Sequence, residues 1–160
     1  DYHAIGLVEI NSIAKGFEVC DAMAKTANVT VLVAKSICPG KYIVMIGGDV
    51  AAVRQSVEAG GGDRRFDIVD TFVIPNIHPS VLPAISGGNS IDKVEAMGVI
   101  ETYSVAATIE AADAAVKAAI PLYKKSHPDV EIKHTTPASP STSTGVDSHT
   151  FHVAHRQKYT

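Results

Sequence analysis

The chain has 160 residues with a formal net charge of −3 at pH 7, and 46% of its residues are hydrophobic, which is enough for one generous domain or two small ones. Basic residues do not gather in a stripe with aromatic ones, so the sequence lacks the electrostatic footprint of a nucleic-acid-binding protein. Apolar runs stay short of the roughly 20 residues of a membrane span, and we expect a cytoplasmic protein without membrane segments.

The chain opens with a predicted strand and helix. Residues 4–10 form a short β-like run, and the Ser12 hydroxyl is placed to cap a following helix. Apolar residues of this helix recur at steps of four and three, which predicts that one face is buried. They are Ile13, Phe17, Cys20, Ala24 and Ala27. Cys20 is accordingly interpreted as a small core residue rather than a ligand.

Two β-branched runs follow, at residues 29–37 and 42–46, with Cys38-Pro39-Gly40-Lys41 between them. This arrangement predicts a hairpin. Pro at the second place and Gly at the third favour a type II turn, because Pro presets its φ and Gly accepts a positive φ. We therefore expect Cys38 at an exposed turn, where the neighbouring Lys41 ammonium favours the thiolate form.

A second helix and a last strand complete the predicted domain. Asp49 is placed to cap a helix whose inner stripe is Val50, Val53 and Val57 and which stops at residues 60–62; residues 66–74 form the strand. The order β-α-β-β-α-β predicts an α+β domain of ferredoxin-like type, with two helices on one face of an antiparallel sheet. We assign residues 1–78 to this domain and 79–93, rich in Pro, Gly and Asn, to a linker.

Residues 96–119 repeat residues 4–27 at a constant offset, with roughly ten of about 24 positions identical. The identities include Glu101 for Glu9, Ser104 for Ser12 and Lys117 for Lys25. A carboxylate kept at matched places of a duplicated module favours a role in packing or at an interface over acid–base catalysis. The two matched lysines are interpreted as solvated charges near helix ends. We expect no enzyme activity.

The repeat stops after Ala119. Residues 94–119 thus begin a second copy of the domain, with a strand and a helix alone, and residues 120–160 are predicted to be a divergent, disordered tail. A shifted reading frame, an artificial junction and natural divergence are all compatible with this end. His149, His152 and His155 recur at every third place, but no carboxylate or thiol joins them, which favours a solvated tail over a metal site.

Several motifs together resemble one known family, the bacterial microcompartment shell proteins. The motifs that carry the resemblance are residues 4–9, 12–16, 21–23 with Lys25 and Ala27, and Gly48-Asp49-Val50, and the match extends over residues 4–119. The stretches 73–79 and 82–87 and the hairpin 37–41 are similar to the trimeric tandem-domain type found in propanediol-utilisation compartments.

This resemblance implies a structural protein. Three chains would form a pseudohexameric tile that packs with other shell proteins around an enclosed enzyme cargo. It also implies that Cys38 from each of three chains binds a shared 4Fe-4S iron–sulfur cluster in a central pore, for electron transfer, with Pro39, Gly40 and Lys41 in the pore loop. A single cysteine cannot hold such a cluster, so this metal site requires an oligomer. The fold alone permits an alternative, a trimeric ferredoxin-like regulatory module that binds small molecules.

Overall fold

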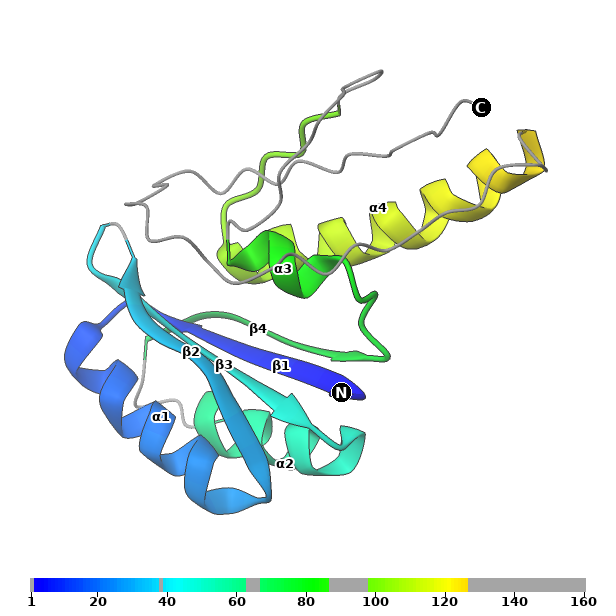
Figure 1. Ribbon diagram of the computed structural model, residues 1–160. Helices are drawn as coiled ribbons and strands as arrows, with labels where there is room; N and C mark the ends of the chain where they lie inside the picture. The colour runs from blue at the N-terminus through cyan, green and yellow to red at the C-terminus, as the bar shows by residue number, and fades with distance from the viewer. Residues whose placement is uncertain (1, 38, 63–66, 87–97, 127–160) are drawn as a thin grey trace. The chain divides into compact units, whose positions relative to one another are not determined.

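The computed structural model describes residues 2–37, 39–62, 67–86 and 98–126, and it divides the chain into two compact units. The first unit comprises residues 1–77 together with 103–107, and the second comprises 78–102 together with 108–160. The elements of Figure 1 are, in chain order, β1 (Ala4–Ile10), α1 (Ile13–Thr26), β2 (Val29–Ile37), β3 (Lys41–Gly48), α2 (Val50–Gly61), β4 (Ile68–Pro75), α3 (Val81–Ile85) and α4 (Val105–Ser126).

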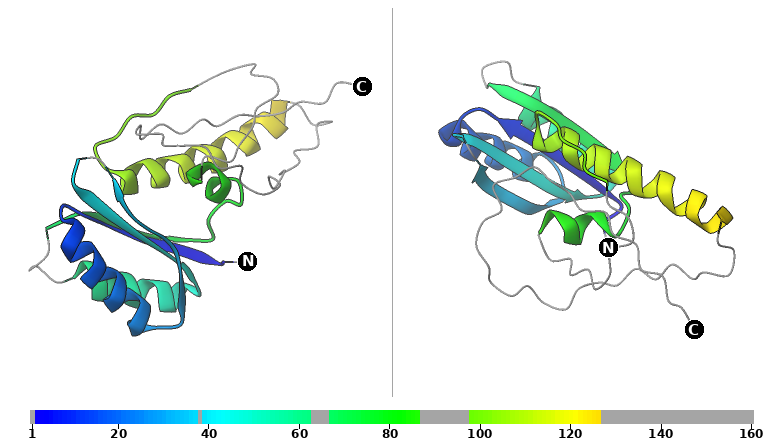
Figure 2. Two further views of the ribbon diagram at one scale, coloured as in Figure 1. Left: turned by 60° about the vertical axis from the view of Figure 1, so that its left-hand side comes forward. Right: turned by 90° about the horizontal axis from the view of Figure 1, so that it is seen from above.

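The first unit is built on a four-stranded sheet in the order β2-β3-β1-β4, and every neighbouring pair is antiparallel. Helices α1 and α2 both lie against the same face of this sheet, as two views show (Figures 1 and 2). The predicted α+β fold with two helices on one face of an antiparallel sheet is therefore confirmed. Strand β1 lies between two neighbours, and every residue in it is buried.

The two predicted helix caps are confirmed. Ser12 Oγ accepts a hydrogen bond from Lys15 N at 3.3 Å, and Asp49 Oδ1 accepts one from Ala51 N at 3.0 Å. These bonds satisfy N–H groups that have no partner within the first turn of a helix. Helix α2 ends as predicted, with Gly62 as the cap residue, and Val53 and Val57 of its inner stripe are buried in the core.

The buried face of α1 was predicted wrongly. Ile13 and Phe17 are 43% and 63% exposed, whereas the buried residues of α1 are Gly16, Val19 and Met23. A Cβ atom at Gly16 would lie only 2.4 Å from Tyr42 ring carbons, so the absence of a side chain lets the helix approach β3 closely. The helix carries two overlapping apolar stripes, and this small residue decides which of them faces the sheet.

The β2–β3 hairpin joins the strands through the predicted turn. Gly40 has φ of 76°, the positive value that a type II turn requires at its third place. Pro39 and Gly40 are both exposed, and Lys41 is the first residue of β3. Cys38 lies outside the described residues, so its predicted place at the turn stays a prediction.

The second unit differs from the predicted partial copy in two respects. Residues 98–101 repeat part of β1 but form no strand; Val99 is 60% exposed, whereas its counterpart Leu7 is fully buried. Among the described residues these apolar side chains have no partner strands equivalent to β3 and β4. Helix α4 continues past Ala119 to Ser126 and includes Pro121, so the tail does not begin at residue 120 as predicted.

The predicted linker and tail are described only in part. A five-residue helix, α3, lies within the predicted linker 79–93. The three regularly spaced histidines, at 149, 152 and 155, lie outside the described residues, as does the rest of the predicted disordered tail after residue 126. Within the described ranges, no helix is both long and apolar enough to cross a membrane.

Candidate functional site

The most unusual group in the first unit is Glu9, a carboxylate in the middle of the sheet whose side chain is fully buried. Successive side chains of a strand point to opposite faces. Ala4, Val8 and Ile10 belong to the core formed with α1 and α2, so Glu9 lies on the face away from those helices. A buried carboxylate requires compensating partners because its removal from water is costly.

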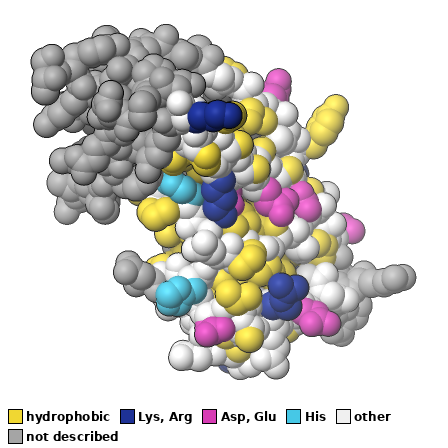
Figure 3. Space-filling model, turned by 90° about the vertical axis from the view of Figure 1, so that its right-hand side faces the viewer, with side chains coloured by type: hydrophobic (Ala, Val, Ile, Leu, Met, Phe, Trp, Pro, Cys, Tyr) yellow, Lys and Arg dark blue, Asp and Glu magenta, His cyan; other side chains and the backbone are white. Residues whose placement is uncertain are grey.

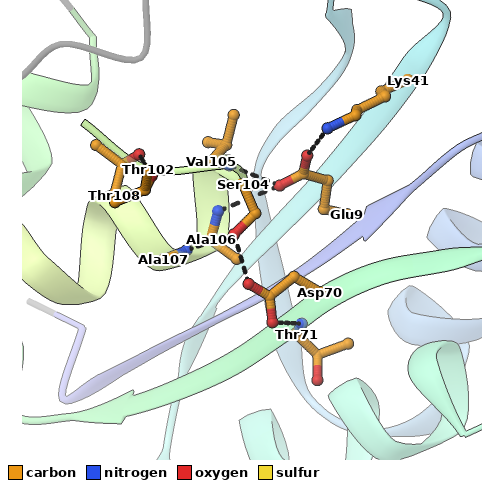
Figure 4. A network of polar contacts seen from close by, with 10 residues as sticks. All are labelled: Glu9, Lys41, Asp70, Thr71, Thr102, Ser104, Val105, Ala106, Ala107 and Thr108. Carbon is orange, nitrogen blue, oxygen red and sulfur yellow. Dashed lines mark hydrogen bonds and ion pairs between the residues drawn. The ribbon is translucent and has the colours of Figure 1, made fainter.

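Three hydrogen bonds compensate the Glu9 carboxylate (Figure 4). Oε1 accepts from Lys41 Nζ at 2.9 Å, and Oε2 accepts from Val105 N at 2.7 Å and from Ala106 N at 3.2 Å. The strand register explains the ion pair: Glu9 is opposite Ile43 on β3, and Lys41 lies two residues further along the same face. Lys41 is itself mostly covered, with 18% of its side chain exposed.

The two backbone donors belong to the first turn of α4, which begins at Val105. The third N–H of that turn, from Ala107, donates to Ser104 Oγ at 3.0 Å. Ser104 Oγ in turn donates to Asp70 Oδ2 at 2.5 Å, and Asp70 is paired with Glu9 across β1 and β4. Glu9 and Ser104 together therefore satisfy three of the N–H groups that an isolated helix leaves unpaired, and negative charge is favourable at this end of the helix dipole.

This network links the two copies of the sequence repeat, because Glu9 belongs to the first copy and residues 104–107 to the second (Figure 4). Its chemistry is that of a structural contact. Both oxygens of Glu9 are engaged by fixed donors, which leaves the carboxylate no role as a general base. The interpretation of Glu9 as a packing or interface residue agrees with this geometry.

Comparison with known proteins identifies the architecture. Residues 4–77 match the family model described as the BMC domain. The chain is 34% identical to the bacterial microcompartment shell protein PduA of Salmonella typhimurium over 89 residues, which cover 54% of this chain and 95% of that protein. The chain belongs to the bacterial microcompartment shell protein family.

Two further matches cover a larger share of the chain. The chain is 60% identical over 115 residues to the shell protein PduT of Citrobacter freundii, covering 72% of this chain and 62% of that protein. A crystal structure of a microcompartment protein from Desulfitobacterium hafniense DCB matches with a TM-score of 0.62 and 54% identity, covering 71% of this chain and 63% of that one. This shell protein thus spans less than two thirds of the length of both. Because the relatives are structural shell proteins, the prediction of a non-enzyme is confirmed.

The charged pairs on the helices of the shell protein repeat along with the sequence. Lys25 Nζ lies 2.7 Å from Asp21 Oδ2 on α1, and Lys117 Nζ lies 2.6 Å from Asp113 Oδ2 on α4, one helical turn apart in each case. The Lys25 side chain is 74% exposed, in agreement with a solvated charge. On the face drawn in Figure 3, Lys and Arg side chains stand among Asp and Glu side chains over the described residues.

Within the described part of the chain, the other predicted site residues do not form a common site. Pro39 and Gly40 are exposed in the hairpin turn, and the Lys41 ammonium is bound to Glu9. His78 donates its backbone N–H to Asp113 Oδ1 at 2.8 Å within the second unit, which is a structural role. Among the described residues no cluster of three or more metal-ligating side chains occurs.

Cys20 packs against the core from α1 and is partly buried, which agrees with its interpretation as a core residue. Burial raises the pKa of the Cys20 thiol above its ordinary value, and the nearby Asp21 carboxylate raises it further. The thiol therefore stays protonated at neutral pH and is a poor nucleophile and metal ligand.

The partners of Glu9 were missed by the sequence analysis. The signal that was available is local: an acidic residue within an apolar strand, repeated as Glu101, with a capping serine three residues later in both copies. That pattern marks the two carboxylates as related. It does not reveal that the carboxylate of one copy caps the helix of the other.

We predict that the Glu9–Lys41 pair contributes measurably to stability. At pH 7, Glu9→Gln lowers the free energy of unfolding by about 2 kcal/mol, because a buried charge-assisted network loses its charge. Lys41→Met alone also destabilises, and the double variant loses at least about 1 kcal/mol less than the sum of the two. Urea unfolding at one fixed protein concentration gives the free energy of unfolding of the wild type, the two single variants and the double variant.

The control for this double-mutant comparison is the exposed ion pair between Lys25 and Asp21 on α1. Asp21→Asn is expected to cost no more than about 0.5 kcal/mol, the value typical of a solvated ion pair. A Glu9→Gln cost as small as that of Asp21→Asn would contradict the role of the buried carboxylate.

The raised pKa of Cys20 predicts slow alkylation. In a Cys38→Ser background at pH 7, iodoacetamide reacts with Cys20 more slowly than with a cysteine peptide, and the rate rises as pH approaches the raised pKa and thiolate forms. Asp21→Asn accelerates the reaction because removal of the neighbouring negative charge lowers the pKa, whereas Glu58→Gln on α2 leaves the rate unchanged. Mass spectrometry of quenched samples gives the rates; a peptide-like rate for Cys20 at pH 7 would count against this assignment.

Proposed function

We propose that this chain is a tile subunit in the shell of a propanediol-utilisation-type microcompartment in the cytoplasm, where three chains form a pseudohexameric ring. The ring packs with other shell proteins and encloses an enzyme cargo. The observation that carries this proposal is the contact of Glu9 with the first turn of α4. It joins the first shell domain to the start of a second copy, and a contact of this kind between copies of one module is suited to building a ring.

Two further observations support the assembling role. The 60% identity to PduT covers 72% of this chain, and apolar side chains at the start of α1 are exposed, Ile13 at 43% and Phe17 at 63%. Exposed large apolar side chains next to one another favour burial against a partner. The alternative of a small-molecule-binding regulatory module has no comparable support, because the relatives are named as shell proteins.

The assembly proposal predicts that the purified chain forms extended sheets or regular tiles in negative-stain electron microscopy, with a closed oligomer in sedimentation velocity. The comparison is Phe17→Glu, which places a charge on the exposed apolar face of α1 and should abolish the assemblies; circular dichroism verifies that this variant is folded. A chain that sediments as a monomer at all concentrations tested, and shows no sheets or tiles, would overturn the proposal.

We also propose that the ring holds a 4Fe-4S cluster through Cys38 of each chain and that the cluster transfers electrons across the shell. The chain has two cysteines, and one of them, Cys20, is partly buried, which leaves a single suitable thiol per chain. The cysteines can therefore hold an iron–sulfur cluster only when several chains come together. An iron–sulfur cluster supplies reversible one-electron transfer when bound.

The neighbours of Cys38 support this assignment through their geometry. Pro39 and Gly40 are exposed, and the positive φ of Gly40 turns the chain sharply at the end of the hairpin. The ion pair between Lys41 and the buried Glu9 fixes the first residue of β3 to the sheet. A short turn anchored at its base in this way is a suitable frame for a shared ligand set.

The cluster proposal predicts about four iron atoms per three chains in protein purified without oxygen, together with broad absorption near 400 nm. Cys38→Ser removes both signals, while the matched variant Cys20→Ser retains them. Iron analysis and visible spectroscopy on the same oligomeric fractions provide the measurement. An iron-free oligomer with Cys38 intact, after anaerobic reconstitution with iron and sulfide, would refute the cluster but not the tile.

A further inference from the structure

We propose that the Glu101 carboxylate of one chain accepts hydrogen bonds from the start of α1 in a second copy of the chain. This contact repeats, between chains, the contact that Glu9 makes with the start of α4 within the chain. The inference rests on the proposed assembly and adds to it the residues that join one chain to the next.

The sequence repeat defines the equivalent atoms. At the constant offset of the repeat, Glu101 corresponds to Glu9, and the capping residue Ser104 corresponds to Ser12. The donors correspond as well: Val105 and Ala106, whose N–H groups bind Glu9, have Ile13 and Ala14 as counterparts. Each half of the observed contact is therefore present a second time in the chain.

In the described residues, the second set of groups is unused. Ser12 satisfies the N–H of Lys15 alone, as Ser104 satisfies that of Ala107. The N–H groups of Ile13 and Ala14 donate to no described residue. Glu101 is exposed and makes no hydrogen bond or ion pair within the described ranges. A carboxylate and a helix start with unpaired N–H groups are complementary in charge and in hydrogen bonding.

The difference in exposure between α1 and α4 also indicates that the partner is a second copy of the chain. Ala106 and Ile109 of α4 are fully buried, whereas their counterparts on α1 are exposed: Ala14, and Phe17 at 63%. The Phe17 ring lies 5.2 Å from the Tyr42 ring, which holds part of this apolar face against β3. The same helix face is thus covered in one copy and open in the other. The occupant that matches it is the surface around Glu101 on another copy of this chain.

This geometry makes the contact head-to-tail. Each chain offers one acceptor, Glu101, and one helix start, at Ile13, so the two sides of the contact are made of different groups. A contact of this heterologous kind generates a ring when its rotation closes. Glu101 and the first turn of α1 therefore act as the two ends by which a chain joins its neighbours.

The test compares the oligomers of four variants of the full chain by sedimentation velocity over a range of protein concentrations. Glu101→Gln keeps the shape of the side chain and removes its charge, and it should raise the concentration of half-dissociation about tenfold. Glu58→Gln makes the same change on the exposed face of α2 and should have no effect. Circular dichroism verifies that each variant is folded.

The second pair of variants removes the donor. Ile13→Pro deletes the N–H at the first position of α1, where proline is well accepted in helices, and Ser12 has the extended backbone that a residue before proline adopts. Ile13→Ala truncates the side chain but keeps the N–H. We expect Ile13→Pro to dissociate the oligomer at least several-fold more readily than Ile13→Ala.

The outcomes separate this contact from the proposed assembly. An oligomer that responds equally to Glu101→Gln and Glu58→Gln, or equally to Ile13→Pro and Ile13→Ala, overturns the contact and leaves the tile proposal standing. A wild-type chain that stays monomeric overturns both. Dissociation by Glu101→Gln and by Ile13→Pro, with both controls intact, supports both.

Discussion

The buried carboxylate of Glu9 is the constraint around which the first unit is arranged. An ionised group without solvent contact is tolerated in a protein interior only with several compensating partners, and Glu9 obtains them from Lys41 on β3 and from two N–H groups of α4. The register of the sheet places the Lys41 ammonium within reach of Glu9, and the second copy of the repeat supplies helix α4. Loss of either partner leaves a charge or a helix end unsatisfied, so the strand, the hairpin base and the helix start depend on each other.

Duplication explains why a single chain contains both a satisfied and an unsatisfied version of this arrangement. The first copy supplies the acceptor for the helix of the second, whereas no described residue accepts a hydrogen bond from the N–H groups of Ile13 and Ala14 or donates one to Glu101. The exposed Phe17 and the buried Ile109 occupy matching positions with opposite exposure. In a shell protein family this asymmetry is suited to assembly, because a surface left open on one chain is closed by another.

The candidate functional residues also depend on contacts between copies of the chain. No cluster of three or more side chains that could bind a metal ion occurs among the described residues, and both carboxylate oxygens of Glu9 are engaged in structural hydrogen bonds. Cys20 is partly buried with a raised pKa, so the proposed cluster depends on Cys38 from several chains. A shared cluster and a shell tile therefore need the same thing, a contact that brings several copies together.

The sequence by itself determined the order of strands and helices in the first unit, both caps, the positive φ at Gly40, the duplication and the family, because these depend on local propensity and on motifs that can be compared directly along the chain. Only the tertiary structure decided which stripe of α1 is buried, since Gly16 against Tyr42 sets that choice through contact with a distant strand. It also decided that residues 98–101 form no strand, because a strand requires partners, and that Glu9 caps α4, because that contact joins residues far apart in the chain.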